Sequence, residues 1–132
     1  RDLSVLQDHV RSSYNIVLLL TPNVLMRPWI LVELATAIEA NIPIIPLEIL
    51  RPGISFQFPT EEYYRQLLTG TLLGEDGQAV LRDADVSLTL LEKGLRGIFK
   101  KIAFRYSPHR PAHIRRAEID TLVRSCRQSL LS

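Results

Sequence analysis

The hydrophobic pattern of residues 13–47 predicts a strand, a helix and a second strand. The run Ile16–Leu20 is continuously apolar and ends in a Thr-Pro-Asn turn, and residues 42–47 have the same apolar character. An unbroken apolar run suits a strand that is buried on both faces, as in a parallel sheet covered by helices. A helix is expected at 29–40, with Pro28 at its first position. Together these elements predict a right-handed βαβ unit.

Helix signals also occur on either side of this unit. Apolar residues recur at helical spacing over 2–11, and Thr60 stands as a helix N-cap before acidic residues, which predicts a short helix at 61–68. The glycines at 74–77 predict a turn. Residues 78–84 are ambiguous between a loop and one further helical turn.

The last third of the chain is predicted to contain two helices and a strand. A helix is expected at 87–100, where Gly94 and Gly97 would allow close packing on the sheet, and alternation over 102–106 predicts a final strand. The clearest amphipathic helix is expected at 110–131. Its apolar face, which we expect to belong to the core, consists of Ile119, Leu122, Val123, Cys126 and Leu130.

The segment between the first two strands contains a combination of short motifs. The run LLLTPNVL leads into the helix entry RPW, and a Trp-x-x-x-Glu pattern joins Trp29 to Glu33 before IPIIP. With these motifs the chain resembles the second half of a Toll/interleukin receptor (TIR) domain, most closely over about residues 12–50. One difference is Ile30, because many members of that family have Cys after the Trp.

The resemblance implies an α/β fold with a flavodoxin-like parallel sheet flanked by helices. Residues 1–132 would then be a single TIR-like domain that lacks its N-terminal strands. Because the strand Ile16–Leu20 shows no polar alternation, we expect it to be central in the sheet. An unpaired edge beside it would be an aggregation hazard. We therefore expect a segment before Arg1, or another chain, to pair with this edge.

Glu33 is the main candidate for chemistry. It lies one helical turn after Trp29 on the same face of the predicted helix, among apolar neighbours. Burying an acid in such surroundings costs stability unless its charge is used. In TIR domains that are enzymes, the Glu of this motif is the catalytic residue that cleaves nicotinamide from NAD⁺. The structural alternative is a solvated Glu33 paired with Arg27 or with an arginine near the C-terminus.

Three further residues are weaker candidates for binding the nucleotide. Trp29 either lines a nucleotide pocket or anchors the helix by its buried area, and the second reading is favoured two to one. Asn23 and Arg27 lie in the loop at the carboxyl end of the first strand, where ligands of open α/β sheets bind. Their default reading is helix capping and solvation.

Two functions follow from the resemblance. In the first, the protein is an NAD⁺ hydrolase in a signalling or defence context, active when TIR domains assemble as homo-oligomers. In the second, it is a non-catalytic TIR module that scaffolds by self-association. Enzymes of this family also hold the nucleotide with the part that is missing here, so residues 1–132 alone are expected to be inactive. NAD⁺ is a substrate in this reading, and no cofactor is expected.

Composition and charge limit the other functions that the chain could have. A net charge of +2 does not by itself favour nucleic acid or a membrane, and no apolar run reaches the length of a membrane span. The single cysteine and the absence of a visible signal peptide favour the cytoplasm. A basic region lies near 100–116, and its default reading is a solvated helix start. His109 and His113 have no third ligand nearby, so no metal site is expected.

Overall fold

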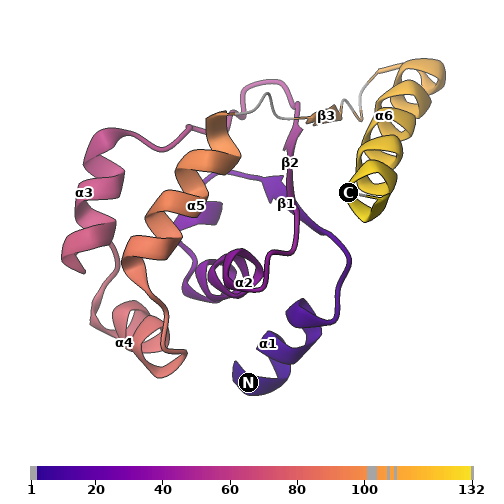
Figure 1. Cartoon of the computed structure of the whole chain (residues 1–132). Coiled ribbons are helices and arrows are strands. Elements are labelled where there is room, and N and C mark those ends of the chain that lie inside the picture. Colours follow the sequence, from indigo (N-terminus) through magenta and orange to yellow (C-terminus); the bar gives the residue numbers. More distant parts are fainter. Residues whose placement is uncertain (1–2, 101–103, 107, 109, 132) are drawn as a thin grey trace.

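The computed structural model describes residues 3–100, 104–106, 108 and 110–131, which form helices and three strands (Figure 1). In chain order the elements are α1 (Leu3–Arg11), β1 (Ile16–Leu20), the 3-10 helix η1 (Val24–Met26), α2 (Pro28–Glu39), β2 (Ile44–Ile49), α3 (Glu61–Thr69), α4 (Glu75–Asp83), α5 (Leu88–Lys100), β3 (Phe104–Tyr106) and α6 (Ala112–Leu131). The chain is a mixed α/β protein with helices around a parallel sheet.

The sheet has the strand order β1-β2-β3. β1 and β2 pair in parallel from Ile16 opposite Ile44 to Leu20 opposite Glu48, and β3 pairs in parallel with the end of β2. The predicted strand–helix–strand unit is confirmed, with Pro28 in the first turn of α2. Among the described residues β1 forms one edge of the sheet, in agreement with the open edge expected beside it, and a central position for β1 would need a further strand.

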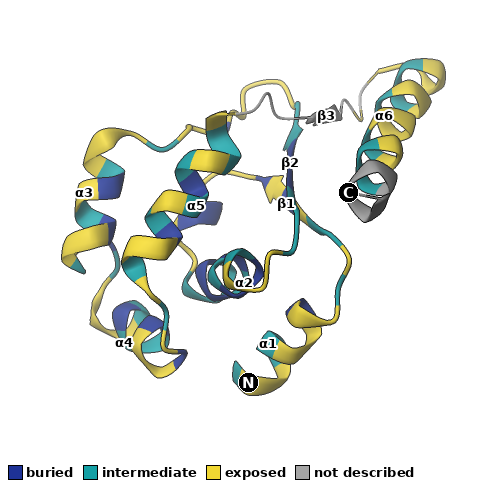
Figure 2. Cartoon of the chain, viewed as in Figure 1, coloured by how far each residue is buried: buried dark blue, intermediate teal, exposed yellow. Residues whose placement is uncertain are grey.

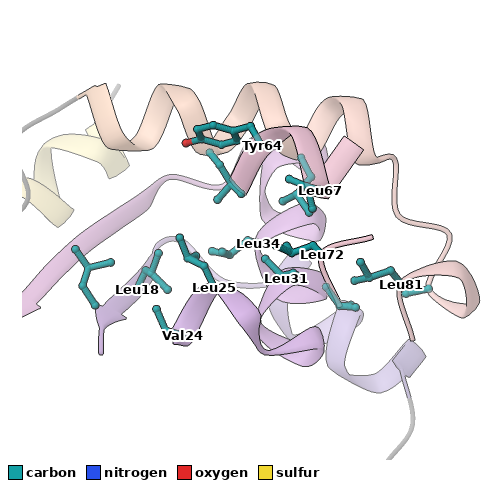
Figure 3. Close-up of a cluster of buried hydrophobic side chains, with 14 of the residues drawn as sticks. Leu18, Val24, Leu25, Leu31, Leu34, Tyr64, Leu67, Leu72 and Leu81 are labelled. Carbon is teal, nitrogen blue, oxygen red and sulfur yellow. The ribbon is translucent and has the colours of Figure 1, made fainter. Parts of the chain in front are cut away.

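Four helices build the core on one side of the sheet. Figure 1 shows α2 and α5 beside the strands, with α3 and α4 farther out. Leu31 of α2 and Leu91 and Leu95 of α5 have exposed fractions of 0%. Figure 3 shows how side chains from β1, η1, α2, α3 and α4 gather into one cluster. The burial of this cluster is the main stabilising contribution of the fold.

The other face of β1 is open. Leu18 and Leu20 point into the core and are 4% and 1% exposed, whereas Val17 and Leu19 are 41% and 48% exposed. The prediction that this strand is buried on both faces is therefore wrong. A strand presents successive side chains to opposite faces, and only one face of β1 is covered by helices.

The prediction of two-sided burial is correct for the centre of β2. Ile45 and Leu47, which lie opposite Val17 and Leu19 in the parallel register, are 5% and 9% exposed. Both stand outside the main cluster. The helix α6 lies on this side of the strands (Figure 1). Of β1 and β2, only the edge strand β1 has this face exposed.

Cap residues set the limits of α3 as predicted. The Thr60 hydroxyl accepts a hydrogen bond from the backbone N–H of Tyr63 at 3.2 Å. The helix ends at Gly70, whose φ of 74° is the left-handed conformation that favours glycine. Both signals are local in the sequence, which explains why the prediction succeeds.

The turn predicted at 74–77 is wrong, because residues Glu75–Asp83 form α4. Gly77 lies inside this helix, and a methyl group there would approach the Cβ of Leu73 to 2.9 Å and the Cγ of Pro28 to 3.2 Å. The glycine is thus required by packing between α4 and its neighbours. It does not interrupt the helix.

The helix predicted at 87–100 is confirmed as α5, and its two glycines differ. Gly94 lies against Ile38 of α2, so it allows the close approach of two helices. The expected role of this glycine in packing on the sheet is therefore wrong. Gly97 has no atom near the position of a Cβ.

The helix predicted at 110–131 is confirmed as α6, but its apolar face is not part of the core. Ile119 and Val123 are 44% and 39% exposed, and Cys126 is only half-buried. Figure 2 shows the helix with exposed and intermediate residues. Ile102, at the start of the predicted final strand, lies outside the described residues. The burial of Leu130 is likewise not described. In the described part of the chain, no helix is both long and apolar enough to cross a membrane.

Candidate functional site

Glu33 lies on α2 at the border between the core and a surface cavity. Its neighbours Leu31, Val32 and Leu34 are at most 1% exposed, whereas Glu33 is half-buried. The helix therefore holds the carboxylate at the rim of the core, where it is partly screened from water. A charge at such a position interacts more strongly with other charges than it would on an open surface.

The cavity beside Glu33 has a volume of about 280 Å³ and lies between α2 and the edge strand. Arg27 and Glu33 bring the charged groups, and Ile30 belongs to the same wall. The opposite wall is β1, including Val17 and Leu19. This arrangement brings one cation and one anion to the same small cavity. It can hold a molecule that carries both phosphate and a developing positive charge.

The backbone of β1 also faces this open edge. The N–H of Ile16 donates to the carbonyl of Pro43 at 2.9 Å, on the β2 side. Because backbone groups alternate in direction along a strand, those of Val17 and Leu19 point toward the free edge. The cavity is thus bordered by polar backbone atoms as well as by side chains.

The structure brings together only part of the predicted site. Arg27 and Glu33 line the same cavity, but Trp29 is not among the described residues that line it. Trp29 is half-buried in the first turn of α2, which agrees with an anchoring role. Asn23 is exposed, has a left-handed φ of 64°, and makes no capping hydrogen bond with its side chain. Asparagine tolerates this conformation better than most residues, which explains why an asparagine stands at the start of η1.

Asn23 lines a different cavity of about 390 Å³, under the loop that precedes α3. Tyr63 lies in the same wall, and its hydroxyl donates to the carbonyl of Leu25 at 2.8 Å. Burial raises the pKa of the Tyr63 hydroxyl, so Tyr63 is a neutral donor at any ordinary pH. This tyrosine fixes η1 against α3.

An aromatic cluster closes the same end of the sheet. The loop before α3 contributes Phe56 and Phe58, and α5 contributes Phe99. The ring centroids are 5.2 Å apart for Phe56 and Phe58, and 5.8 and 5.7 Å from these two rings to Phe99. Phe56 is 8% exposed and Phe58 is 48% exposed. Pairs with this geometry stabilise the loop beyond their buried area.

Sequence reasoning did not find Arg96, which ties α5 to α3. Its guanidinium donates two hydrogen bonds to Glu61, at 2.6 and 2.9 Å, and lies 4.1 Å from the centre of the Tyr64 ring. It also pairs with Glu92 one turn away. The hydrogen bond from Arg96 lowers the pKa of Glu61. The residues are 35 apart in sequence, so local spacing could not have revealed this link.

No metal site is found in the described part of the chain. The described residues contain no group of three or more His, Cys, Asp or Glu side chains that could hold a metal ion. In the basic region Arg110, His113 and Arg116 are exposed on or near the start of α6. His109, one half of the histidine pair considered above, lies outside the described residues.

The comparisons with known proteins do not identify the chain. No protein-family model matches it, and the searches of curated proteins and of solved structures found no match.

Proposed function

We propose that this protein is an NAD⁺ hydrolase of the TIR type, with Glu33 as the catalytic carboxylate and a flavodoxin-like arrangement of its sheet. The observation that carries the proposal is the position of Glu33 at the border of the core, in a cavity of about 280 Å³ that it shares with Arg27. The Trp-x-x-x-Glu resemblance motivates the reaction. The structure supports it by giving the carboxylate an accessible cavity of its own.

The reaction needs one anion at the ribose and no general acid. The bond between ribose C1′ and the nicotinamide nitrogen breaks, and its electron pair remains on nicotinamide, which leaves as a neutral molecule. The ribosyl oxocarbenium ion that develops is stabilised by the Glu33 carboxylate. A water molecule then adds to C1′ and loses a proton, which gives ADP-ribose. Arg27 is placed to hold a phosphate of the substrate.

A second function is favoured by the open edge of β1. The exposed Val17 and Leu19, together with unpaired backbone groups, suit the addition of a strand from another segment or another chain. In that reading the domain is a non-catalytic TIR module that works by self-association in the cytoplasm. A strand added there would also border the Glu33 cavity, so self-association at this edge does not exclude hydrolysis, and only the absence of catalysis distinguishes the second function.

Release of nicotinamide from NAD⁺ tests the catalytic proposal. The full-length natural protein is assayed at concentrations high enough for assembly, beside Glu33→Gln and Glu33→Ala. Glu33→Gln keeps the size and removes the charge, so we expect the rate to fall by about a hundredfold or more in both variants. Glu39→Gln is the matched control, since Glu39 is exposed on the same helix, and its rate should be unchanged.

The same assay separates the two functions. No nicotinamide release from a protein that self-associates would reject the hydrolase and support the interaction module. An active protein whose rate survives Glu33→Gln would reject the assigned role of Glu33. Circular dichroism of each variant establishes that the fold is retained.

A further inference from the structure

A third cavity lies at the carboxyl ends of β1 and β2, and Glu33 is not among its described lining residues. It has a volume of about 420 Å³ and is mainly apolar, with Leu19, Ile54 and Phe56 among its lining residues. Ligands of open α/β sheets bind beyond the carboxyl ends of the strands. The size falls within the range of small-molecule pockets, about 300–1,000 Å³.

The cavity exists because two turns diverge at this end of the sheet. The chain leaves β1 through Thr21, and after β2 it folds back on itself in a short bridge between Arg51 and Ile54. The N–H of Ile54 donates to the carbonyl of Arg51 at 3.2 Å, and Gly53 has the positive φ of 74° that this turn requires. The fold-back holds Ile54 in the cavity wall although its side chain is 49% exposed.

Arg51 is the charged residue of this wall, and it stands at the join with a smaller cavity. The smaller cavity, of about 290 Å³, shares Arg51 and Ile54 with the larger one and adds Arg110 and Glu48. Arg51 and Arg110 are exposed, and neither has an ion pair within the described part of the chain. The unpaired guanidinium group of Arg51 in a mainly apolar wall suits an anion attached to an apolar body, and Arg110 adds a second positive charge in the adjoining cavity, where Glu48 also lies.

We propose that this cavity binds a small molecule with a flat apolar ring and one anionic group, a phosphate or a carboxylate. The ring lies against Leu19, Ile54 and Phe56, and the anion pairs with Arg51. Glu33 does not line this cavity among the described residues. Leu19 and Thr21 line both cavities, so the two sites are neighbours, and they are distinguished by their charged residues, Arg51 here and Glu33 with Arg27 there.

Titration with three probes, followed by NMR of the backbone amides of the full-length natural protein, tests the site. The probes are naphthyl phosphate, naphthoate and the neutral naphthyl methanol. We expect an anionic probe to shift the amides of Leu19, Gly53 and Ile54, and to bind about tenfold more tightly than the neutral one. Tighter binding of naphthyl phosphate assigns the site to phosphates, and tighter binding of naphthoate assigns it to carboxylates.

Variants separate this site from general surface binding. Arg51→Gln should weaken the anionic probe about tenfold and leave the neutral probe unchanged. Arg82→Gln, on an exposed arginine of α4, is the matched control and should change neither. Glu33→Gln should also leave binding unchanged, which separates this test from the assay of hydrolysis. The proposal is overturned by equal affinity for charged and neutral probes, by an unaffected Arg51→Gln, or by the absence of shifts at these amides.

Discussion

Leu18 and Leu19 are neighbours in β1 and chemically identical, yet they are 4% and 48% exposed. Leu18 faces the side covered by α2 and α5, where Leu31, Leu91 and Leu95 are fully buried. Leu19 faces the side where α6 lies, and on that side Val17, Ile119 and Val123 are also exposed. The apolar pattern is equally strong on both sides of the strand. The comparison teaches that an apolar pattern shows which face of a strand or helix is suited to burial, and not whether another element covers that face.

The largest expected difference in stability is between alanine variants of the two adjacent leucines. Leu18→Ala removes a packed side chain and should cost about 2–5 kcal/mol in the free energy of unfolding. Leu19→Ala removes a side chain that is already half in water and should cost about 1 kcal/mol or less. Urea denaturation of both variants measures the difference. Equal costs would break the comparison, because they would mean that the open face of β1 is covered in solution.

Two glycines of α5 test how tightly the packed side is closed. A methyl group at Gly94 would lie 2.7 Å from Cγ1 and 3.0 Å from Cγ2 of Ile38. Gly94→Ala should therefore destabilise the protein by about 1–2 kcal/mol, even after the gain in helix propensity. Gly97→Ala, in the same helix with no atom near the added methyl, should stabilise by about 0.5–1 kcal/mol. Thermal denaturation compares the two variants.

A second variant explains the Gly94 result. Ile38→Ala removes the atoms that the new methyl meets, so the cost of Gly94→Ala should be smaller in that background. A cost that stays the same would mean that α2 and α5 are farther apart in solution.

The smallest expected effect concerns a charge on α3, at the border of the packed side. Hydrogen bonds from Arg65, at 2.8 Å, and from Gln66, at 2.9 Å, lower the pKa of Glu62 from 4.5 to about 2. Because this pKa is depressed in the folded state, the stabilisation is complete above pH 4.5 and is lost as the pH falls toward 2. The carboxyl carbon shift of Glu62 measures the midpoint, which Arg65→Gln should raise toward 4.5. A midpoint near 4.5 in the unchanged protein would indicate that α3 is not held in a fixed geometry.

Much of the secondary structure follows from local signals. Thr60 and Gly70 define α3, and Pro28 marks the start of α2, because each acts through its own backbone and nearest neighbours. The strand–helix–strand unit was predictable for the same reason. Gly77 was misread as part of a turn, because its role depends on Leu73 and on the distant Pro28.

The candidate site was predictable only in part. The Trp-x-x-x-Glu spacing predicted Glu33 as the acid, and in the structure it lines a cavity together with Arg27. It also places Asn23 at another cavity. The role of Arg51 could not be predicted, because its cavity forms only where β1 and β2 end side by side.

The sequence by itself determined the helices and strands other than α4 and η1, their order and the parallel pairing of β1 with β2. These depend on backbone conformation, caps and apolar periodicity, which are properties of short segments. Only the tertiary structure decided which apolar faces are buried. Burial depends on contacts between segments far apart in the chain, such as Gly94 with Ile38 and Arg96 with Glu61, and it leaves Leu19 and Val123 exposed.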